Sequence, residues 1–431
     1  MKVVIPSELV ALGQYLPRFL GLVGERLWFK RLDQLDAAQH RSPFNWKIIS
    51  DYHWLEMAIG FQHDVLMKEG VLRPELVDEL IVAALKFAAS TVEIHARLSP
   101  LGQKNLEGRL RDCLKAETSY ASLFLELDLA QRLMDAGFDV SFADMEGTGQ
   151  FDLLFGKDSF VGEVECKSQS ADAGRQIHRK DFYRFMEAIL PALEVQRAAC
   201  RREVLLITLD TRLSPSTSDQ ARLLTAVRSI LADGARTSFA GGGFVLERLN
   251  FDAVVPDQSM SGPEALYKAC GTAFGANTHI SGGLTAEGGC LVVMRSKRED
   301  DTSKPLLEAM RKAASQLSGQ RPGFIAIQDH GIAAADLMLP HVQRRAAILS
   351  LALYGRYGGS HVTATYVTAF GAVILRNGVL GTPAFAVLNP VPKFPLNPAD
   401  ASSLLALMSD ETYTGSTEPL SSETISPGVR R

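Results

Sequence analysis

The stretch FVGEVECKSQ, Phe160 to Gln169, alternates apolar and charged side chains over most of its length. Such alternation predicts a β-strand, in which residues two positions apart point to the same face. Glu163, Glu165 and Lys167 therefore share one face of the strand, and the apolar side chains between them take the other. Three ionic groups on one face indicate either a solvent-exposed edge or a catalytic cluster.

The segments around this strand predict an α/β unit. SYASLFLELDLAQRLMDAG has the periodicity of a helix that ends at Gly137, FDVSFAD and FDLLFGK have the pattern of strands, and a long helix is expected from Ala173 to Cys200. Further strands are expected at EVLLITL, GFVLERLNFDAVV, CLVVMRS, GFIAIQD, HVTATYVT and GAVILR, with a helix at KPLLEAMRKAASQLSG. We therefore expect residues 118–400 to form one α/β domain built on a mixed sheet.

The region before this unit, residues 1–117, is predicted to be a helical domain. PELVDELIVAALKFAASTVEIHARL begins with a proline and acidic residues, and its apolar residues recur at three- and four-residue spacing. No H-E-x-x-H pair occurs, so we interpret the polar residues of this region as solvated helix faces rather than a metal site. The residues concerned are His53, Glu56, His63 and Asp64. Residues 401–431, rich in Ser, Thr, Glu and Pro, are predicted to be a disordered tail.

The composition is that of a large globular protein, with 431 residues of which 46% are hydrophobic. A net charge of -4 argues against a strongly basic nucleic-acid coat but leaves room for a local basic groove. The start MKVVIPSELV does not resemble a signal peptide, and no uncharged apolar stretch has the length of a membrane span, so we expect a cytoplasmic protein without a membrane partner. The five cysteines form no C-x-x-C pair, so the sequence indicates neither a disulfide framework nor a zinc knuckle.

Two carboxylates and a lysine can converge near the opening strand. Asp152 lies in FDLLF, thirteen residues before Glu165, with a turn from Gly156 to Ser159 between them. If the two strands form a hairpin, these carboxylates and Lys167 meet at one end of the sheet. Carboxylates at this spacing can hold a divalent cation such as magnesium while leaving positions for water. The cation would polarise a phosphodiester, and the lysine would orient the attacking water or stabilise negative charge on phosphorus.

This ordered set of residues resembles the PD-(D/E)XK, or restriction-endonuclease-like, nuclease superfamily. Asp152 matches the motif aspartate, and VECK supplies the acidic position at Glu165 and the lysine at Lys167. Glu126, in LFLELDLA, matches the acidic residue that the preceding helix often contributes. The resemblance implies that all four residues are catalytic, and that the three carboxylates bind Mg²⁺, for which Mn²⁺ can substitute.

The resemblance covers residues 119–193, and it departs from the superfamily at Phe151, which stands where a proline is usual. It implies a restriction-endonuclease-like mixed sheet flanked by helices, preceded by an all-helical N-terminal region. The implied activity is hydrolysis of phosphodiester bonds in nucleic acid, DNA rather than RNA because the superfamily acts mostly on DNA. The alternative is a catalytically inactive nuclease-like domain that serves as a binding or assembly module.

The helix expected after the opening strand carries the basic segment GRQIHRKDFYRF. Arg175, Arg179 and Lys180, on a helix beside a metal site, are candidates for contacts with a phosphate backbone. A solvated face with ordinary charge pairing explains the segment equally well. The N-terminal helical region is expected to regulate the enzyme, or to bind substrate, a second copy of the chain or another protein.

Overall fold

The computed structural model describes residues 1–404 apart from short gaps. The gaps are residues 42, 74–76, 116–119, 198–200, 234–235, 256–262, 276, 286–287, 372, 375–379, 382, 398–399 and 402–403, and residues 405–431 are not described either. Within the described part of the chain, no helix is long and apolar enough to cross a membrane. The predicted tail from residue 401 lies outside the described residues except for Ala401 and Leu404, and Leu404 is buried in the core.

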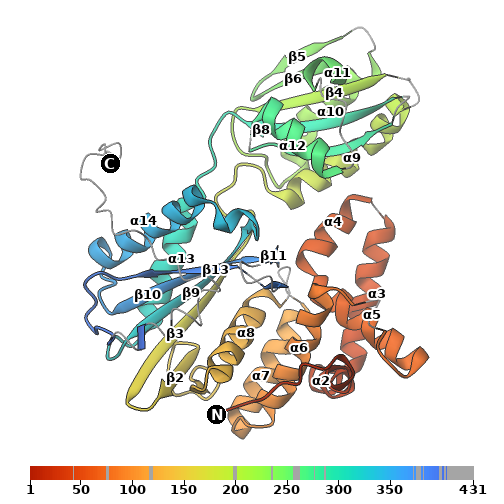
Figure 1. The fold of residues 1–431 in the computed structure, drawn as a ribbon. Helices are drawn as coiled ribbons and strands as arrows, with labels where there is room; N and C mark the ends of the chain where they lie inside the picture. The colour runs from red at the N-terminus through yellow and green to blue at the C-terminus, as the bar shows by residue number, and fades with distance from the viewer. Residues whose placement is uncertain are drawn as a thin grey trace.

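Helices are the only regular elements among the described residues before position 116, in red and orange in Figure 1. They are α1 (Leu9–Gly13), α2 (Leu16–Val23), α3 (Glu25–Arg41), α4 (Pro43–Tyr52), α5 (Trp54–Glu69), α6 (Glu79–His95) and α7 (Pro100–Cys113). The helix predicted from Pro74 begins only at Glu79, because the Asp78 side chain accepts a hydrogen bond from the Ile81 N–H at 2.9 Å and caps α6. The expected boundary at residues 117 and 118 lies outside the described residues.

A six-stranded mixed sheet follows these helices, with the strand order β1-β2-β3-β9-β10-β13. Its strands are β1 (Asp139–Phe142), β2 (Leu153–Lys157), β3 (Phe160–Gln169), β9 (Gly323–Ala333), β10 (Val362–Phe370) and β13 (Ala384–Leu388). The first three strands form an antiparallel meander, and β9 pairs in parallel with β3. The strand FVGEVECKSQ therefore lies in the interior of the sheet, and its interpretation as an exposed edge is wrong.

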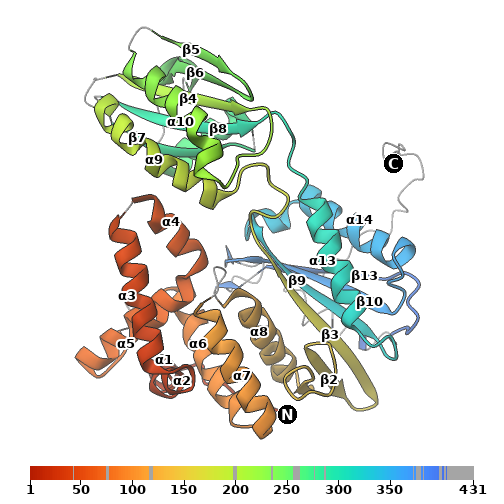
Figure 2. The ribbon, with the colours of Figure 1, turned by 180° about the vertical axis from the view of Figure 1, so that it is seen from behind.

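Helices cover both faces of this sheet, as the two views in Figures 1 and 2 show. α8 (Ala121–Asp135) lies on one face, where Val164 and Cys166 of β3 join a core shared with the N-terminal helices. α13 (Ser303–Gln316) and α14 (Pro340–Arg356) cover the other face, where Ile325 and Ile327 of β9 pack against them. A short 3-10 helix, η2 (Asp336–Met338), links β9 to α14, and β11 (Val373–Ile374) pairs with β12 (Leu380–Gly381).

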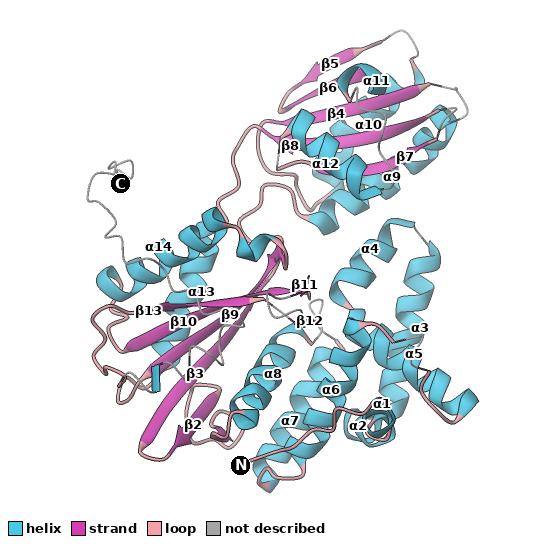
Figure 3. Ribbon diagram, viewed as in Figure 1, coloured by secondary structure: helices cyan, strands magenta, loops and turns pink. Residues whose placement is uncertain are grey.

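A second, five-stranded sheet is built from the chain between β3 and α13, and it is drawn as a separate group of arrows in Figure 3. Its order is β5-β6-β4-β8-β7. Its strands are β4 (Arg202–Leu209), β5 (Ser238–Gly241), β6 (Phe244–Asn250), β7 (His279–Leu284) and β8 (Gly289–Ser296), and its helices are α9 (Arg179–Arg197), α10 (Thr217–Ala232), α11 (Phe251–Val254) and α12 (Pro263–Phe274). We call residues 179–296 the inserted lobe.

The expectation of a single mixed sheet is therefore wrong, although most of the expected strands exist. β4 is apolar on both faces, so it needs cover on both sides. Leu205 and Ile207 pack with α9 and α10, whereas Val204 and Leu206 pack with residues of α11 and α12. Because α9 to α12 come from the same stretch of chain, the inserted lobe buries its strands in cores of its own.

Two strand predictions also differ in length from the structure. The strand expected over GFVLERLNFDAVV ends at Asn250, because the Asn250 side chain accepts a hydrogen bond from the Ala253 N–H at 3.0 Å and starts α11. Of the strand expected at GAVILR, the structure describes Val373 and Ile374 as β11, and much of the remainder lies outside the described residues.

Candidate active site

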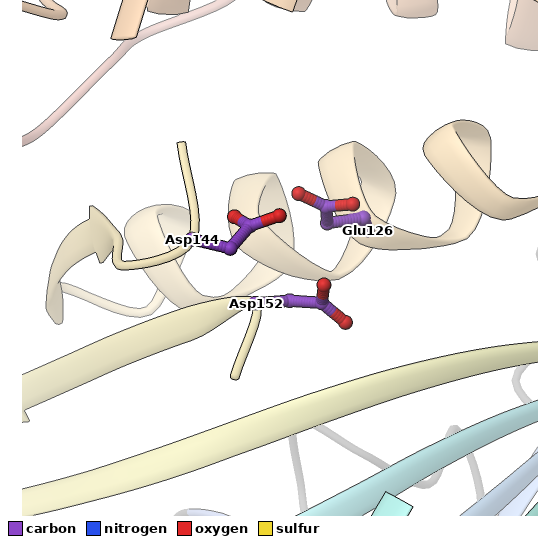
Figure 4. A group of neighbouring side chains, drawn as sticks. All are labelled: Glu126, Asp144 and Asp152. Atoms are coloured by element: carbon purple, nitrogen blue, oxygen red, sulfur yellow. The ribbon is translucent and has the colours of Figure 1, made fainter. Parts of the chain in front are cut away.

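Three carboxylates gather beside the start of β2, as Figure 4 shows. Glu126 lies within α8, Asp144 follows β1, and Asp152 immediately precedes β2. Each of them offers an oxygen atom, and these atoms all lie within 4.8 Å of one another. The connection between β1 and β2 is closed by a hydrogen bond from the Ala143 N–H to the Asp152 carbonyl oxygen at 2.9 Å. Oxygen ligands of this kind suit a hard divalent cation.

The composition of this group differs from the metal ligands expected from the sequence. The structure brings Glu126 and Asp152 together, but the third member of the compact group is Asp144 rather than Glu165. Asp144 ends the predicted strand FDVSFAD, and a polar residue at a strand end was the available signal. The antiparallel return of β2 beside β1 carries Asp152 back to Asp144.

Arg109 of α7 occupies one side of the carboxylate group. Its guanidinium donates hydrogen bonds to both carboxylate oxygens of Glu126, at 3.0 and 2.5 Å, and to Oδ2 of Asp144 at 3.0 Å. Sequence patterns could not single out Arg109, because it belongs to an ordinary amphipathic helix and its partners lie 17 and 35 positions along the chain. The Arg109 guanidinium thus links Glu126 of α8 to Asp144 of the β1–β2 connection.

Glu165 and Lys167 extend the site along β3. Glu165 is 1% exposed, and its Oε2 accepts a hydrogen bond from the Asp152 backbone N–H at 3.2 Å. The Lys167 ammonium donates to the other Glu165 oxygen and to Oε1 of Gln316, at the end of α13, at 2.7 Å. Because both carboxylate oxygens are engaged and the side chain is buried, Glu165 is not part of a solvated surface ion pair.

Two backbone contacts fix Asp152 against β3. The Cys166 N–H donates to Oδ2 of Asp152 at 2.7 Å, and the Asp152 N–H donates to Glu165. The antiparallel register of Leu153 with Val164, continued by one residue, places Asp152 opposite Glu165. The predicted hairpin is therefore present, and it sets the aspartate beside the E-x-K strand.

Burial makes these carboxylates hard to ionise. It raises the pKa of Glu126 to about 8, against the opposing effect of the Arg109 guanidinium. It also raises the pKa of Glu165 to about 7, and the neighbouring Asp152 carboxylate adds to this rise. The pKa values of Asp144 and Asp152 are raised as well, chiefly by burial. Several perturbed acids in one place are typical of a functional site.

The charge balance of the cluster leaves room for a cation. In the described part of the chain, two positive side chains are bonded to the carboxylates: Arg109 to Glu126 and Asp144, and Lys167 to Glu165. Four negative charges against two positive charges leave two negative charges when all the acids are ionised. One divalent cation would balance this excess and would favour the ionised form of each acid.

The basic residues predicted to bind substrate do not share one helix. Arg175 precedes α9, which begins at Arg179 rather than near Ala173. Arg175 donates to the carbonyl oxygens of Ala171 and Gly331, at 2.8 and 3.2 Å. The Arg179 guanidinium lies 3.9 Å from the Asp172 carboxylate, and Lys180 lines a cleft. Arg175 and Arg179 therefore hold the segment after β3 in place, and Lys180 remains a candidate for substrate contact.

The interpretation of His53 and Glu56 as residues on solvated helix faces is wrong. They are 6% and 0% exposed, and Nδ1 of His53 lies 3.1 Å from Oε1 of Glu56. Arg31 of α3 lies against the same imidazole, with its Nη2 3.2 Å from Nε2 of His53. Asp64, by contrast, is exposed. Helical periodicity could not reveal this burial, because the covering residue comes from another helix.

Comparison of the chain with protein-family models, with curated proteins and with solved structures gives no match. In the described part of the chain, the fold is that of a mixed α/β protein with two large mixed sheets and a small two-stranded one. The acidic cluster, made of Glu126, Asp144, Asp152 and Glu165, lies where α8, the β1–β2 connection and β3 meet.

Proposed function

We propose that the chain is a metal-dependent nuclease that hydrolyses phosphodiester bonds in DNA, with Mg²⁺ as its cofactor and Mn²⁺ as a substitute. The observation that carries this proposal is the group of four carboxylates beside Lys167, two of them buried and two half-buried, with two excess negative charges. The chain order α8, β1, β2 and β3, with Asp152 and the E-x-K residues on adjacent strands, agrees with the resemblance to the PD-(D/E)XK superfamily.

The side chains of the cluster have separate roles in this proposal. Glu126, Asp144 and Asp152 would hold the cation, and Glu165 lies beside Asp152. A bound divalent cation would act as a Lewis acid and lower the pKa of a coordinated water. The Lys167 ammonium, held between Glu165 and Gln316, supplies a fixed positive charge for the oxygens of a reacting phosphate.

A plasmid-nicking assay tests the proposed activity. The purified protein should convert supercoiled DNA to nicked or linear DNA with Mg²⁺ or Mn²⁺ and should stop when a chelator is added. Calcium should bind without supporting much turnover, because it tolerates looser geometry. Asp152→Asn should remove the activity, whereas Asp210→Asn, in an exposed ion pair after β4, should leave it unchanged. Activity that persists in Asp152→Asn would contradict the assignment.

A catalytically inactive binding or assembly module is the second candidate, and Arg109 favours it. The Arg109 guanidinium already supplies an internal cation to Glu126 and Asp144, as a cluster retained for structure would require. Titration with Mn²⁺, followed by electron paramagnetic resonance, separates the two candidates. Binding of about one ion, lost in Asp152→Asn, supports the nuclease. Absence of binding by the folded parent supports the module.

A further inference from the structure

A cleft of about 740 Å³ lies between the N-terminal helices and the inserted lobe. One wall comes from α3, α4 and the end of α7, and the other from the segment after β3, α9 and the segment after β4. The two walls meet where α4 contacts α9, which lie side by side in Figures 1 and 2. There Phe44 of α4 is buried in the same core as Phe182 and Phe185 of α9. We call this space the interlobe cleft.

The interlobe cleft is lined by more basic than acidic side chains. Its carboxylates are Asp172 and Asp181, and its lysines and arginines are Arg31, Lys115, Lys180, Arg184 and Arg212. A surplus of positive charge in a concave site attracts an anionic ligand.

Two of these arginines, one on each wall, contact histidine rings. Nη2 of Arg31 lies 3.2 Å from Nε2 of His53, and Nη2 of Arg212 lies 3.0 Å from Nδ1 of His178. An imidazole does not neutralise a guanidinium as a carboxylate does, so both arginines keep their charge available for a ligand.

Two chain segments connect the interlobe cleft to the acidic cluster. β3 carries Lys167 in the cluster and is followed by Ser170 in the cleft wall, three residues and about 10 Å further on. α7 carries Arg109 in the cluster and is followed by Lys115 in the cleft, six residues and again about 10 Å along the helix direction. At a rise of about 3.4 Å per nucleotide, this separation corresponds to a few nucleotides of one strand.

We propose that the interlobe cleft binds a single-stranded segment of nucleic acid and leads its phosphate backbone to the acidic cluster, an inference that rests on the proposed nuclease function. Basic grooves that carry an aromatic side chain are typical of single-strand binding, and Tyr52 of α4 supplies the aromatic ring here. The volume falls in the range of small-molecule sites, about 300–1,000 Å³, which suits a few nucleotides rather than a duplex.

The test compares two double variants that remove the same charge. Arg31→Gln with Arg212→Gln changes both walls of the cleft. Arg26→Gln with Arg222→Gln changes exposed arginines outside it, on α3 and α10. Binding of a fluorescein-labelled 12-mer of thymidylate is followed by anisotropy at several salt concentrations, in the presence of a chelator so that no cleavage occurs.

The parent should bind the 12-mer more tightly than a 12-base-pair duplex. For single strands each phosphate contact contributes about 0.7 to the slope of log affinity against log salt, so the cleft variant should lose about 1.4. At about 0.1 M salt this corresponds to binding roughly 25-fold weaker. The control variant should match the parent, and Arg31→Lys with Arg212→Lys should keep the salt slope.

Several outcomes overturn the inference: no binding by the parent, equal affinity for duplex, equal losses in the two Gln variants, or a loss in the Lys variant as large as in the cleft Gln variant.

Ultraviolet cross-linking of a thiothymidine 12-mer gives a readout that does not depend on the stability of a variant. The labelled peptides should contain Tyr52 or the first turn of α9, and labels elsewhere contradict the cleft. Cleft-dependent binding without cleavage in Mg²⁺ would defeat the nuclease proposal alone, whereas cleavage unaffected by the cleft variant would defeat the cleft alone.

Discussion

The two large sheets bury different kinds of side chain on their central strands, β3 and β4. β4, in the inserted lobe, buries Val204, Leu205 and Ile207 completely. β3, in the six-stranded sheet, buries Glu163 and Glu165 almost as completely, each at 1% exposure. Burial of an ionic group costs free energy unless partners compensate, so a central strand that carries two buried glutamates needs a reason that an apolar strand does not.

The two buried glutamates of β3 have different partners. Glu163 accepts hydrogen bonds from the Ser318 N–H at 2.8 Å and from the Ser318 hydroxyl at 2.6 Å, and it lies 3.2 Å from the Arg321 guanidinium. These partners give Glu163 a structural role, in which it holds the segment after α13 against β3. Glu165 pairs with Lys167, but burial and the neighbouring Asp152 carboxylate still raise its pKa to about 7. On β3, the glutamate with a raised pKa is therefore the one that belongs to the candidate site.

The largest expected effect concerns two ion pairs that each contain a lysine. Lys167 pairs with Glu165 on β3, and Lys297 pairs with Asp210 in the second sheet's lobe. Lys167→Ala should lower the rate of metal-dependent DNA cleavage by about 10²–10³-fold, as loss of a preorganised charge in an active site does. Lys297→Ala removes a lysine whose ammonium lies 2.7 Å from an exposed Asp210 carboxylate beside β8, and it should leave the rate unchanged. Initial rates on a supercoiled plasmid give the comparison. Equal rates for Lys167→Ala and the parent would remove the functional distinction between the sheets.

The next largest effect is on the free energy of unfolding, and it compares a core substitution in β4 with a substitution of Glu165 in β3. Ile207→Ala in β4 removes a side chain that is 0% exposed and should cost about 2–5 kcal/mol. Glu165→Gln should cost much less in metal-free protein, because it removes a charge that burial already disfavours. Denaturant unfolding in a chelator measures both. A larger loss for Glu165→Gln would show that β3 is built for stability in the same way as β4.

The acidic cluster also predicts a pH dependence that an apolar sheet lacks. The pKa of Glu165 is about 7 in the folded protein against an ordinary value of 4.5, so the folded state retains a proton that the unfolded state has released. The contribution of Glu165 to stability is therefore greatest below a pH of about 4.5 and falls as the pH rises to about 7, by about 1.4 kcal/mol per unit. Glu126, with a pKa of about 8, extends the fall upward.

Thermal unfolding at a pH of about 6 and of about 8.5 checks this sign, because both pKa values lie between these points. In a chelator the melting temperature should be lower at the higher pH, and Glu165→Gln should reduce the difference. Magnesium should raise the melting temperature more at the higher pH, since binding requires ionised carboxylates. A melting temperature that rises with pH in metal-free protein would contradict the raised pKa values.

Gln316→Ala gives the smallest predicted effect on the site. Gln316 accepts a hydrogen bond from Lys167 at 2.7 Å and acts as a positioning residue for the ammonium. Loss of a hydrogen bond to a charged group is worth about 1.5 kcal/mol, so kcat should fall about tenfold with KM unchanged. Gln320→Ala, at an exposed position beyond α13, is the matched control. A rise in KM at constant kcat would assign Gln316 to substrate binding instead.

The secondary-structure elements that carry the candidate site could be predicted from the sequence. The alternation of FVGEVECKSQ predicted β3 and the shared face of its ionic residues, and the helical pattern around Glu126 predicted α8. The short turn before the E-x-K strand predicted the hairpin that sets Asp152 beside Glu165. These features are recoverable because side-chain periodicity and turn residues report backbone geometry over a few neighbouring positions.

Which elements meet one another could not be predicted, because this depends on contacts between distant parts of the chain. The choice of Arg109 as the partner of Glu126, the inclusion of Asp144, and the burial of His53 all depend on residues from different helices and connections. The division of the strands into two sheets was hidden for the same reason, because β3 and β4 both have the pattern of a strand, and their partners differ only in sequence-distant contacts. Periodicity states that an apolar face must be covered, whereas packing across the whole chain decides what covers it.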